Sequence, residues 1–234
     1  MTEDKARQQP KVASSQLIRA LGGIAMLSGF LVALVFHLTK PVIAENKRVA
    51  IERAVLQVVP NATGYQQFTL GEQGITMENN QQEGVPVYAA YSASGELSGI
   101  VLEGSAAGYA GKITLLYGYD PVCQCIRGIK VLKMVETPGL GDKIVTDQKF
   151  VANFDALDAR LASDQMQLAN PIVTVKAGTK QLAWEIDAIT GATISSKAVG
   201  RALNGSAQAL LPKLVPEIGK LSQLHVAEPM GDKR

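Results

Sequence analysis

Asp187-Ala188-Ile189-Thr190-Gly191-Ala192-Thr193 ends on a threonine that the pattern places where a tight turn enters a helix. Gly191 can adopt backbone angles that are closed to other residues, and Ala192 adds almost no bulk, so a large reagent could reach the Thr193 hydroxyl. The next residues are Ile194-Ser195-Ser196-Lys197, after which apolar residues recur at helical spacing from 198 to 203. Thr193 is therefore expected to be exposed and chemically accessible.

The helix start beside Thr193 has two interpretations. Thr193 or Ser195 is expected to cap the helix, and the free backbone N–H groups of its first turn would favour an anion there. An isolated Thr-Gly-Ala-Thr is also an ordinary turn before a helix. The motif by itself leaves an anion site and a plain turn both open.

A membrane anchor is predicted near the N-terminus. Ala20 to Leu38 is uncharged and mostly apolar, and its length is close to the roughly 20 residues that a helix needs to cross a bilayer. A cleavable signal peptide is the alternative, since Val42-Ile43-Ala44 resembles a cleavage site. The apolar core is longer than the usual 7 to 15 or so residues of a signal peptide, and Lys40-Pro41 intervenes. One transmembrane helix is the interpretation that we adopt.

The anchor carries three small residues on one helix face, Ala25, Gly29 and Ala33. This spacing lets a second transmembrane helix approach closely, although small residues are common in membrane helices in general. Basic residues flank the span equally on both sides, so the charge pattern does not decide its orientation. The anchor is therefore compatible with a membrane partner, and its orientation stays open.

Composition narrows the chemistry. The formal net charge is only +2 and the basic residues are scattered, which argues against a nucleic-acid partner. His37 and His225 lie far apart in the chain, so no histidine-based metal site is expected. Cys123 and Cys125 are too few for a four-thiolate site, and their close spacing makes a disulfide awkward. We expect two thiols near a hairpin turn, with a redox or shared-cluster role as the alternative.

The rest of the chain predicts an α+β fold, with strands first and helices interspersed later. Helices are expected from Ile43 to about Val59, ended by Pro60, and near Phe150 to Ala162. Short runs separated by turn residues predict the strands. These are 68–70, 85–91, 97–102, 113–120, 126–132, 171–175 and 182–186, with 113–120 and 126–132 paired as a hairpin across the cysteine turn.

Two glycine-containing loops follow the pattern of ligand-facing turns. One is Glu136-Thr137-Pro138-Gly139-Leu140-Gly141-Asp142-Lys143, and the other is Gly108-Tyr109-Ala110-Gly111-Lys112-Ile113. Each must turn sharply, which leaves several backbone amides free to face a ligand. Either loop alone is an ordinary turn.

Taken in order, the anchor, G-Y-x-G-x-I, E-T-P-G-L-G-D-K-I and D-x-x-T-G-A-T resemble the G component of the Rnf ion-translocating electron transport complex. The resemblance covers roughly residues 17 to 211. The C component of the sodium-pumping NADH:quinone reductase carries a similar flavin domain, but the chain length and the octet 136–143 favour the Rnf family.

The resemblance implies that Thr193 carries FMN through a phosphoester bond, installed by a flavin transferase that uses FAD and magnesium. Asp187, Thr190, Gly191 and Ala192 would form the recognition motif of the transferase. The loop Glu136-Thr137-Pro138-Gly139-Leu140 would lie near the isoalloxazine ring. The C-x-C pair is not part of the family pattern.

The resemblance also implies a place in a larger assembly. The chain would relay electrons in a complex that couples transfer between ferredoxin and NAD to sodium or proton movement, and it would not turn over alone. Its partners would be the A, B, C, D and E components of the Rnf complex, the flavin transferase and membrane lipid. A bacterial inner-membrane protein with one span and an external flavin domain is expected.

The corresponding domain boundaries are a cytoplasmic segment 1–19, the transmembrane helix 20–38, a helical stalk 39–60, the FMN-binding domain 61–224 and a tail 225–234.

Retention of the flavin outside the cytoplasm favours a covalent bond. A helix N-terminus contributes at most about 2 kcal/mol to the binding of an anion, whereas micromolar binding needs about 8 kcal/mol. The alternative from another class is a membrane-anchored scaffold that never carries flavin.

Overall fold

The computed structural model describes residues 14–72, 74–77 and 84–227. The chain forms two compact units, one ending at Val49 and the other beginning at Ala50. Most of the predicted N-terminal segment and residues 228–234 of the predicted tail lie outside the described residues. The first three tail positions belong to the last helix, α5 (Ile218–Ala227).

Helix α1 (Ser14–Val58) makes up the described part of the N-terminal unit, and its last residues, from Ala50, belong to the second unit; it includes Pro41 without interruption. In the described part of the chain, α1 is the one helix long and apolar enough to cross a membrane, with a mean hydropathy of 2.1 over its apolar window. None of that window is buried by the protein. An apolar helix without protein cover is what a bilayer-spanning segment requires.

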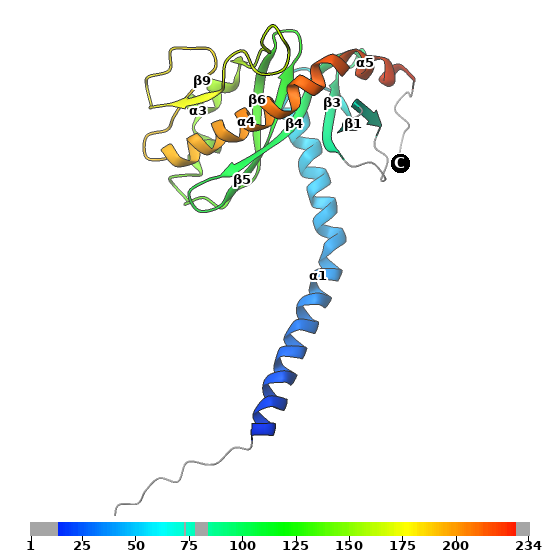
Figure 1. The fold of residues 1–234 in the computed structure, drawn as a ribbon, viewed down its shortest axis with the longest axis vertical. Coiled ribbons are helices and arrows are strands. Elements are labelled where there is room, and N and C mark those ends of the chain that lie inside the picture. The colour runs from blue at the N-terminus through cyan, green and yellow to red at the C-terminus, as the bar shows by residue number, and fades with distance from the viewer. Residues whose placement is uncertain (1–13, 73, 78–83, 228–234) are drawn as a thin grey trace, which may run out of the picture. The chain divides into compact units, whose positions relative to one another are not determined.

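The second unit contains an antiparallel sheet of seven strands in the order β2-β1-β3-β4-β5-β6-β7 (Figure 1). The strands are β1 (Gly64–Gly71), β2 (Gly74–Met77), β3 (Val85–Tyr91), β4 (Leu97–Ala107), β5 (Lys112–Asp120), β6 (Cys125–Lys133) and β7 (Leu157–Asp158). The predicted hairpin across the cysteine turn is confirmed, because β5 and β6 pair in antiparallel register. The α+β class is confirmed as well, while β2 was not predicted.

Both faces of this sheet are buried, by different helices. On one face, Val87 and Leu102 lie in the main core beneath α4 (Thr193–Leu214), which crosses β4 and β5 (Figure 1). On the other face, Tyr88 and Val101 pack against the last turns of α1. Neighbouring residues of a strand point to opposite faces, so β3 (VPVYAAY) carries apolar residues on both faces.

Three glycines let the end of α1 lie close to the sheet. A Cβ atom at Gly118 would overlap the Val58 carbonyl, one at Gly128 would come within 3.2 Å of it, and one at Gly99 would touch Val59. On the opposite face, a Cβ at Gly104 would come within 2.7 Å of the Ala202 carbonyl of α4. Glycine at these positions therefore sets the distance between the sheet and both helices.

The region between the sheet and α4 differs from its prediction. The predicted helix 150–162 is wrong beyond Phe154: α2 (Lys143–Thr146) precedes it, and α3 (Gln148–Val151) with the 3₁₀ turn η1 (Ala152–Phe154) supplies only its first residues. Phe150, Phe154 and Leu157 have helical spacing, but Leu157 instead pairs with Ile126 as an edge strand of the sheet. Tertiary pairing therefore overrides the local helical pattern.

The remaining elements form a small parallel pair and the C-terminal helices. Strands β8 (Val173–Val175) and β9 (Glu185–Asp187) pair in parallel, and β9 leads directly into the Thr193 motif. It begins later than predicted, because the Glu185 carboxylate accepts hydrogen bonds from the N–H groups of Gln181 and Leu182. After α4, η2 (Val215–Glu217) precedes α5.

Candidate functional site

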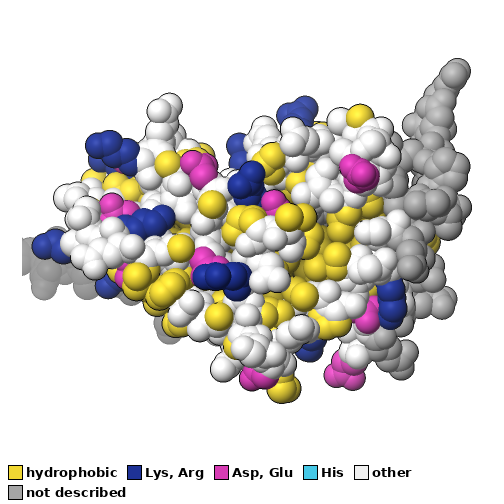
Figure 2. Space-filling view, turned by 90° about the horizontal axis from the view of Figure 1, so that it is seen from above, with side chains coloured by type: hydrophobic (Ala, Val, Ile, Leu, Met, Phe, Trp, Pro, Cys, Tyr) yellow, Lys and Arg dark blue, Asp and Glu magenta, His cyan; other side chains and the backbone are white. Residues whose placement is uncertain are grey.

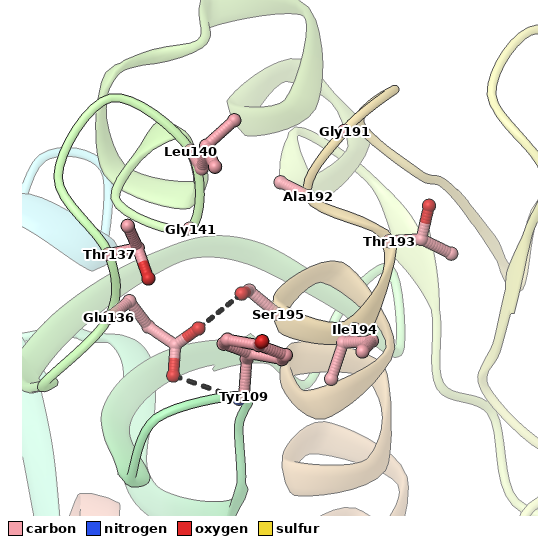
Figure 3. Close-up of a pocket in the computed structure, with 10 residues that line it drawn as sticks. All are labelled: Tyr109, Glu136, Thr137, Leu140, Gly141, Gly191, Ala192, Thr193, Ile194 and Ser195. Carbon is pink, nitrogen blue, oxygen red and sulfur yellow. Dashed lines mark hydrogen bonds between the residues drawn. The ribbon is translucent and has the colours of Figure 1, made fainter.

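Three segments that are distant in sequence surround one pocket of about 470 Å³ (Figure 3). They are the β4–β5 loop, the loop after β6, and the start of α4. Its lining residues are Tyr109, Glu136, Thr137, Leu140, Gly141, Gly191, Ala192, Thr193, Ile194 and Ser195. The three motifs that the sequence singled out therefore form a single site.

The turn into α4 follows the predicted backbone, but its cap differs. Gly191 has φ +85°, the left-handed region that favours glycine, and the helix begins at Thr193. The expected capping by Thr193 or Ser195 is wrong, because no side chain caps the helix from its N-cap residue Ala192. Instead, the buried Ser196 hydroxyl accepts from the N–H of Ile189 and donates to the carbonyl of Ala192. One serine thereby closes the turn and leaves Thr193 without that role.

Thr193 is exposed at the edge of the pocket, with its side chain directed away from Glu136 and Ser195 (Figure 3). Within the described residues its hydroxyl has no hydrogen-bond partner. The N–H groups of Thr193, Ile194 and Ser195 likewise find no acceptor in the described part of the chain, as is usual for a first helical turn. The site therefore combines a free hydroxyl with backbone donors that favour an anion.

Glu136 connects the three segments. One carboxylate oxygen accepts hydrogen bonds from the N–H groups of Tyr109 (3.0 Å) and Ala110 (3.2 Å). The other oxygen accepts a hydrogen bond from the Ser195 hydroxyl. A Cβ at Gly141 would come within 2.7 Å of the same carboxylate, so the loop can close around Glu136 only with glycine at that position. Charge-assisted bonds of this kind are stronger than neutral ones.

The loop after β6 is shaped by its own backbone. The carbonyl of Thr137 accepts from the N–H groups of Leu140 (3.2 Å) and Gly141 (3.0 Å), and Gly139 has φ +77°. This turn brings Leu140 to the pocket wall, opposite Ala192 (Figure 3). Pro138 and Gly139 shape the turn but do not line the pocket.

Asp187 and Thr190 do not line this pocket. They line a second pocket of about 430 Å³, together with Lys143, Asp147, Lys149, Phe150, Ala177, Gly178, Ala188 and Ile189. The Asp187 carboxylate accepts hydrogen bonds from the N–H groups of Gly178 (2.9 Å) and Thr179 (3.2 Å). Of the residues proposed for the flavin, these two are thus not part of the first pocket.

Four pocket residues were not among the predicted binding residues: Tyr109, Gly141, Ile194 and Ser195. Tyr109 and Gly141 lie inside motifs that the sequence did identify, and Ile194 and Ser195 follow Thr193 directly. The sequence did not predict that these residues line one pocket, because this depends on how the loops pack together in the fold.

The pocket combines apolar and polar surface, as small-molecule sites commonly do. Leu140, Ile194 and the 70% exposed Tyr109 supply apolar surface at its rim, while Glu136, Ser195 and the first turn of α4 supply polar groups. In the described residues, no group of three or more His, Cys, Asp or Glu side chains could hold a metal ion.

The surface around the domain is electrostatically mixed. On the face shown in Figure 2, Lys and Arg side chains are interspersed with Asp and Glu, and hydrophobic side chains lie between them. No single-sign stripe that would attract a nucleic acid covers this face.

Cys123 and Cys125 form a disulfide, which corrects the prediction of two free thiols. Their Cα atoms are 5.2 Å apart, within the range that a disulfide requires. Gln124, between them, has φ +54°, and this left-handed residue curls the β5–β6 turn enough to bring the sulfur atoms together. The sequence spacing alone did not reveal this local backbone geometry.

Comparison with known proteins identifies two family patterns. The RnfG N-terminal region matches residues 19–58, and the FMN-binding domain matches residues 108–208, a range that includes the whole first pocket. Three curated relatives are each named as the G component of an ion-translocating oxidoreductase complex. The relative from Pseudomonas aeruginosa is 33% identical over 79% of this chain and 82% of its own.

The relative from Shewanella amazonensis is 32% identical over 79% of this chain and 82% of its own. The one from Methanosarcina acetivorans is 29% identical over 82% of this chain and 94% of its own. Among solved structures, NqrC of Shewanella oneidensis superimposes with a TM-score of 0.55 at 18% identity, covering 79% of this chain and all of that one. That likeness supports the fold.

Proposed function

This chain belongs to the RnfG family, the G components of ion-translocating oxidoreductase complexes, and from that premise we propose that it relays electrons through FMN bound covalently to Thr193. The observation that carries the proposal is the exposed Thr193 hydroxyl at the start of α4, beside a pocket formed by all three motifs. Its family and its FMN-binding domain support the electron-transfer role.

Attachment would proceed on a flavin transferase. Thr193 Oγ forms a bond to the phosphorus of the FMN half of FAD, the bond between the two phosphates breaks, AMP leaves, and the hydroxyl proton passes to the transferase. Thr193 then serves as an anchor and takes no part in turnover. A covalent bond keeps the flavin on the protein. The helix N-terminus alone contributes at most about 2 kcal/mol, far less than the roughly 8 kcal/mol of micromolar binding.

The pocket residues would hold the cofactor in place. The backbone N–H groups of Thr193, Ile194 and Ser195, in the first turn of α4, would be available to the phosphate. Leu140 and Tyr109 would provide apolar contact for the ring, and Glu136 keeps the two loops that carry them in position. When bound, the flavin supplies the capacity to accept and donate one or two electrons.

The proposed assembly is the membrane complex of the A, B, C, D and E components together with this chain. It would couple electron transfer between ferredoxin and NAD to the movement of sodium ions or protons. The chain is then a redox component of a translocase and is inactive alone. The candidate membrane helix within α1 supports an anchored position in such a complex.

We place the FMN domain on the external side of a bacterial inner membrane. The Cys123–Cys125 disulfide supports this side, because disulfides persist in oxidising compartments and are rare in the cytosol. The disulfide lies outside the family motifs.

Substitution of Thr193 tests the proposal. The full chain is co-expressed with its flavin transferase, denatured, and examined for flavin fluorescence in a gel. Thr193→Ala is expected to insert and fold normally but to lose all fluorescence, whereas Thr193→Ser should retain part of it. Thr146→Ala, an exposed threonine of α2, is the matched control and should remain fully labelled. A fluorescent Thr193→Ala protein would overturn the proposal and favour another attachment point.

A further inference from the structure

The side chain of Asn153 forms hydrogen bonds with the backbone of Asp187, the first residue of the motif. The buried Asn153 side chain accepts a hydrogen bond from the N–H of Asp187 (3.0 Å) and donates one to its carbonyl (3.3 Å). The same amide donates to the carbonyl of Phe150 and accepts from the Lys180 ammonium, which fixes its orientation. Asn153 therefore pairs with the Asp187 backbone much as a neighbouring strand would.

The Asp187 side chain is held by a different segment. Its two carboxylate oxygens accept from the N–H groups of Gly178 (2.9 Å) and Thr179 (3.2 Å), in the loop between β8 and β9. Gly178 has φ +79°, and a Cβ atom there would meet nothing within 4 Å. Glycine at position 178 is therefore favoured by the backbone conformation of the turn, whereas the turn has room for a larger side chain.

We infer that Asp187 is a positioning residue: together with Asn153 and the Gly178–Thr179 turn it forms a frame that presents the Thr190–Thr193 segment for flavin attachment. This inference rests on the proposed function. The carboxylate does not line the pocket beside Thr193, and it is already engaged by two N–H groups of its own chain. Its role in the recognition motif follows from what it holds, and direct contact with the transferase or with FAD is not required.

The contrasting mechanism is recognition of the Asp187 charge by the transferase. In that case, changes to the turn that receives the carboxylate would have no effect as long as the charge remains. The two mechanisms can be distinguished by a substitution that destabilises the Gly178–Thr179 turn and leaves every residue of the motif unchanged.

Gly178→Ala does this. Because a left-handed alanine is strained, the turn will be populated less and Asp187 will lose its donors. We expect the initial rate of flavin incorporation, measured as the mass of the Thr193 peptide in the full chain, to fall roughly tenfold. Gly95→Ala is the matched control, since Gly95 has a similar φ of +81° in the β3–β4 turn. It carries the same kind of strain and should be labelled at the wild-type rate.

Two variants of Asp187 complete the test. Asp187→Asn keeps one acceptor oxygen and should retain a measurable part of the rate, whereas Asp187→Ala should lose at least as much as Gly178→Ala. If Asp187→Asn is as inactive as Asp187→Ala while Gly178→Ala is labelled like wild type, the charge is read directly and the inference is wrong.

A second measurement does not depend on flavin. In protein made without the transferase, hydrogen exchange at the amides of Gly178 and Thr179 should be faster in Asp187→Ala than in wild type. Unchanged exchange would overturn the frame even if labelling falls. A wild-type chain that is never labelled would instead refute the proposed function, and the exchange result would still decide whether the frame exists.

Discussion

The carboxylate of Glu136 accepts a hydrogen bond from the hydroxyl of Ser195, which joins the loop after β6 to the first turn of α4. The other oxygen of the same carboxylate binds the β4–β5 loop through two backbone N–H groups. A single half-buried side chain therefore holds together the three segments that line the pocket beside Thr193 (Figure 3).

Removing this carboxylate should destabilise the domain. Glu136→Ala removes three hydrogen bonds to a charged group, which we expect to cost about 1–3 kcal/mol in the free energy of unfolding. Ser195→Ala, which removes one donor and leaves the other two bonds, should cost about 1 kcal/mol or less. Urea unfolding of the flavin-free chain measures both. A Glu136→Ala protein as stable as wild type would show that the three segments hold together without it.

The close contact of α4 with the sheet gives a second prediction. Gly104→Ala places a methyl group against the Ala202 carbonyl and should destabilise by about 1–3 kcal/mol, because the helix must move away from β4. Gly205→Ala, on the exposed side of α4 with nothing within 4 Å, should instead stabilise by about 0.5–1 kcal/mol. Thermal unfolding of the two variants is expected to shift in opposite directions. Shifts of the same sign would contradict this packing.

The features that the sequence predicts correctly are those that depend on residues close together in the chain. Gly191, the hairpin of β5 and β6, and the apolar span in α1 all follow from neighbouring residues, and each is present as predicted. The predicted helix beyond Phe154 failed, because pairing of Leu157 with Ile126 prevailed over local periodicity. Strands at a sheet edge are decided by what lies beside them.

In the candidate site too, local features could be predicted and contacts between distant residues could not. The three motifs could be found in the sequence because glycines and the threonine stand at fixed offsets within each. That Glu136 would join them through Ser195, or that Asn153 would hold Asp187 from 34 positions away, has no local signature. The disulfide was missed for a related reason, since it depends on the left-handed backbone of Gln124.

Buried tyrosines predict loss of stability at alkaline pH. Burial raises the pKa of Tyr91 from 10 to about 12, and burial with the nearby carboxylates of Asp120 and Asp158 raises the pKa of Tyr119 to about 12. Because both pKa values are raised in the folded state, their stabilising effect is complete below pH 10. It is lost as the pH rises through about 12.

The free energy of unfolding should therefore fall steadily from pH 10 to 12, and Tyr91→Phe should reduce the slope. Urea unfolding at each pH gives the slope, and tyrosinate absorbance follows ionisation. The chain has six tyrosines, and ionisation of all of them near pH 10 with the fold intact would contradict this account.

The disulfide gives a further prediction. Protein from intact cells, denatured in alkylating reagent without reductant, should carry no alkyl group on Cys123 or Cys125. Replacing both by serine should lower the free energy of unfolding by about 1–2 kcal/mol, a small effect because the closed loop is so short. Two alkylated thiols in the wild-type protein would remove this support for an external domain.

The mass of the peptide that contains Thr193 tests the central claim most directly. The full chain is co-expressed with the flavin transferase, in cells shown to label a known substrate, and denatured before digestion. A gain of one FMN less one water, located on Thr193, is the result that we predict. An unmodified peptide from those cells would contradict the covalent relay and favour a membrane-anchored protein that carries no flavin.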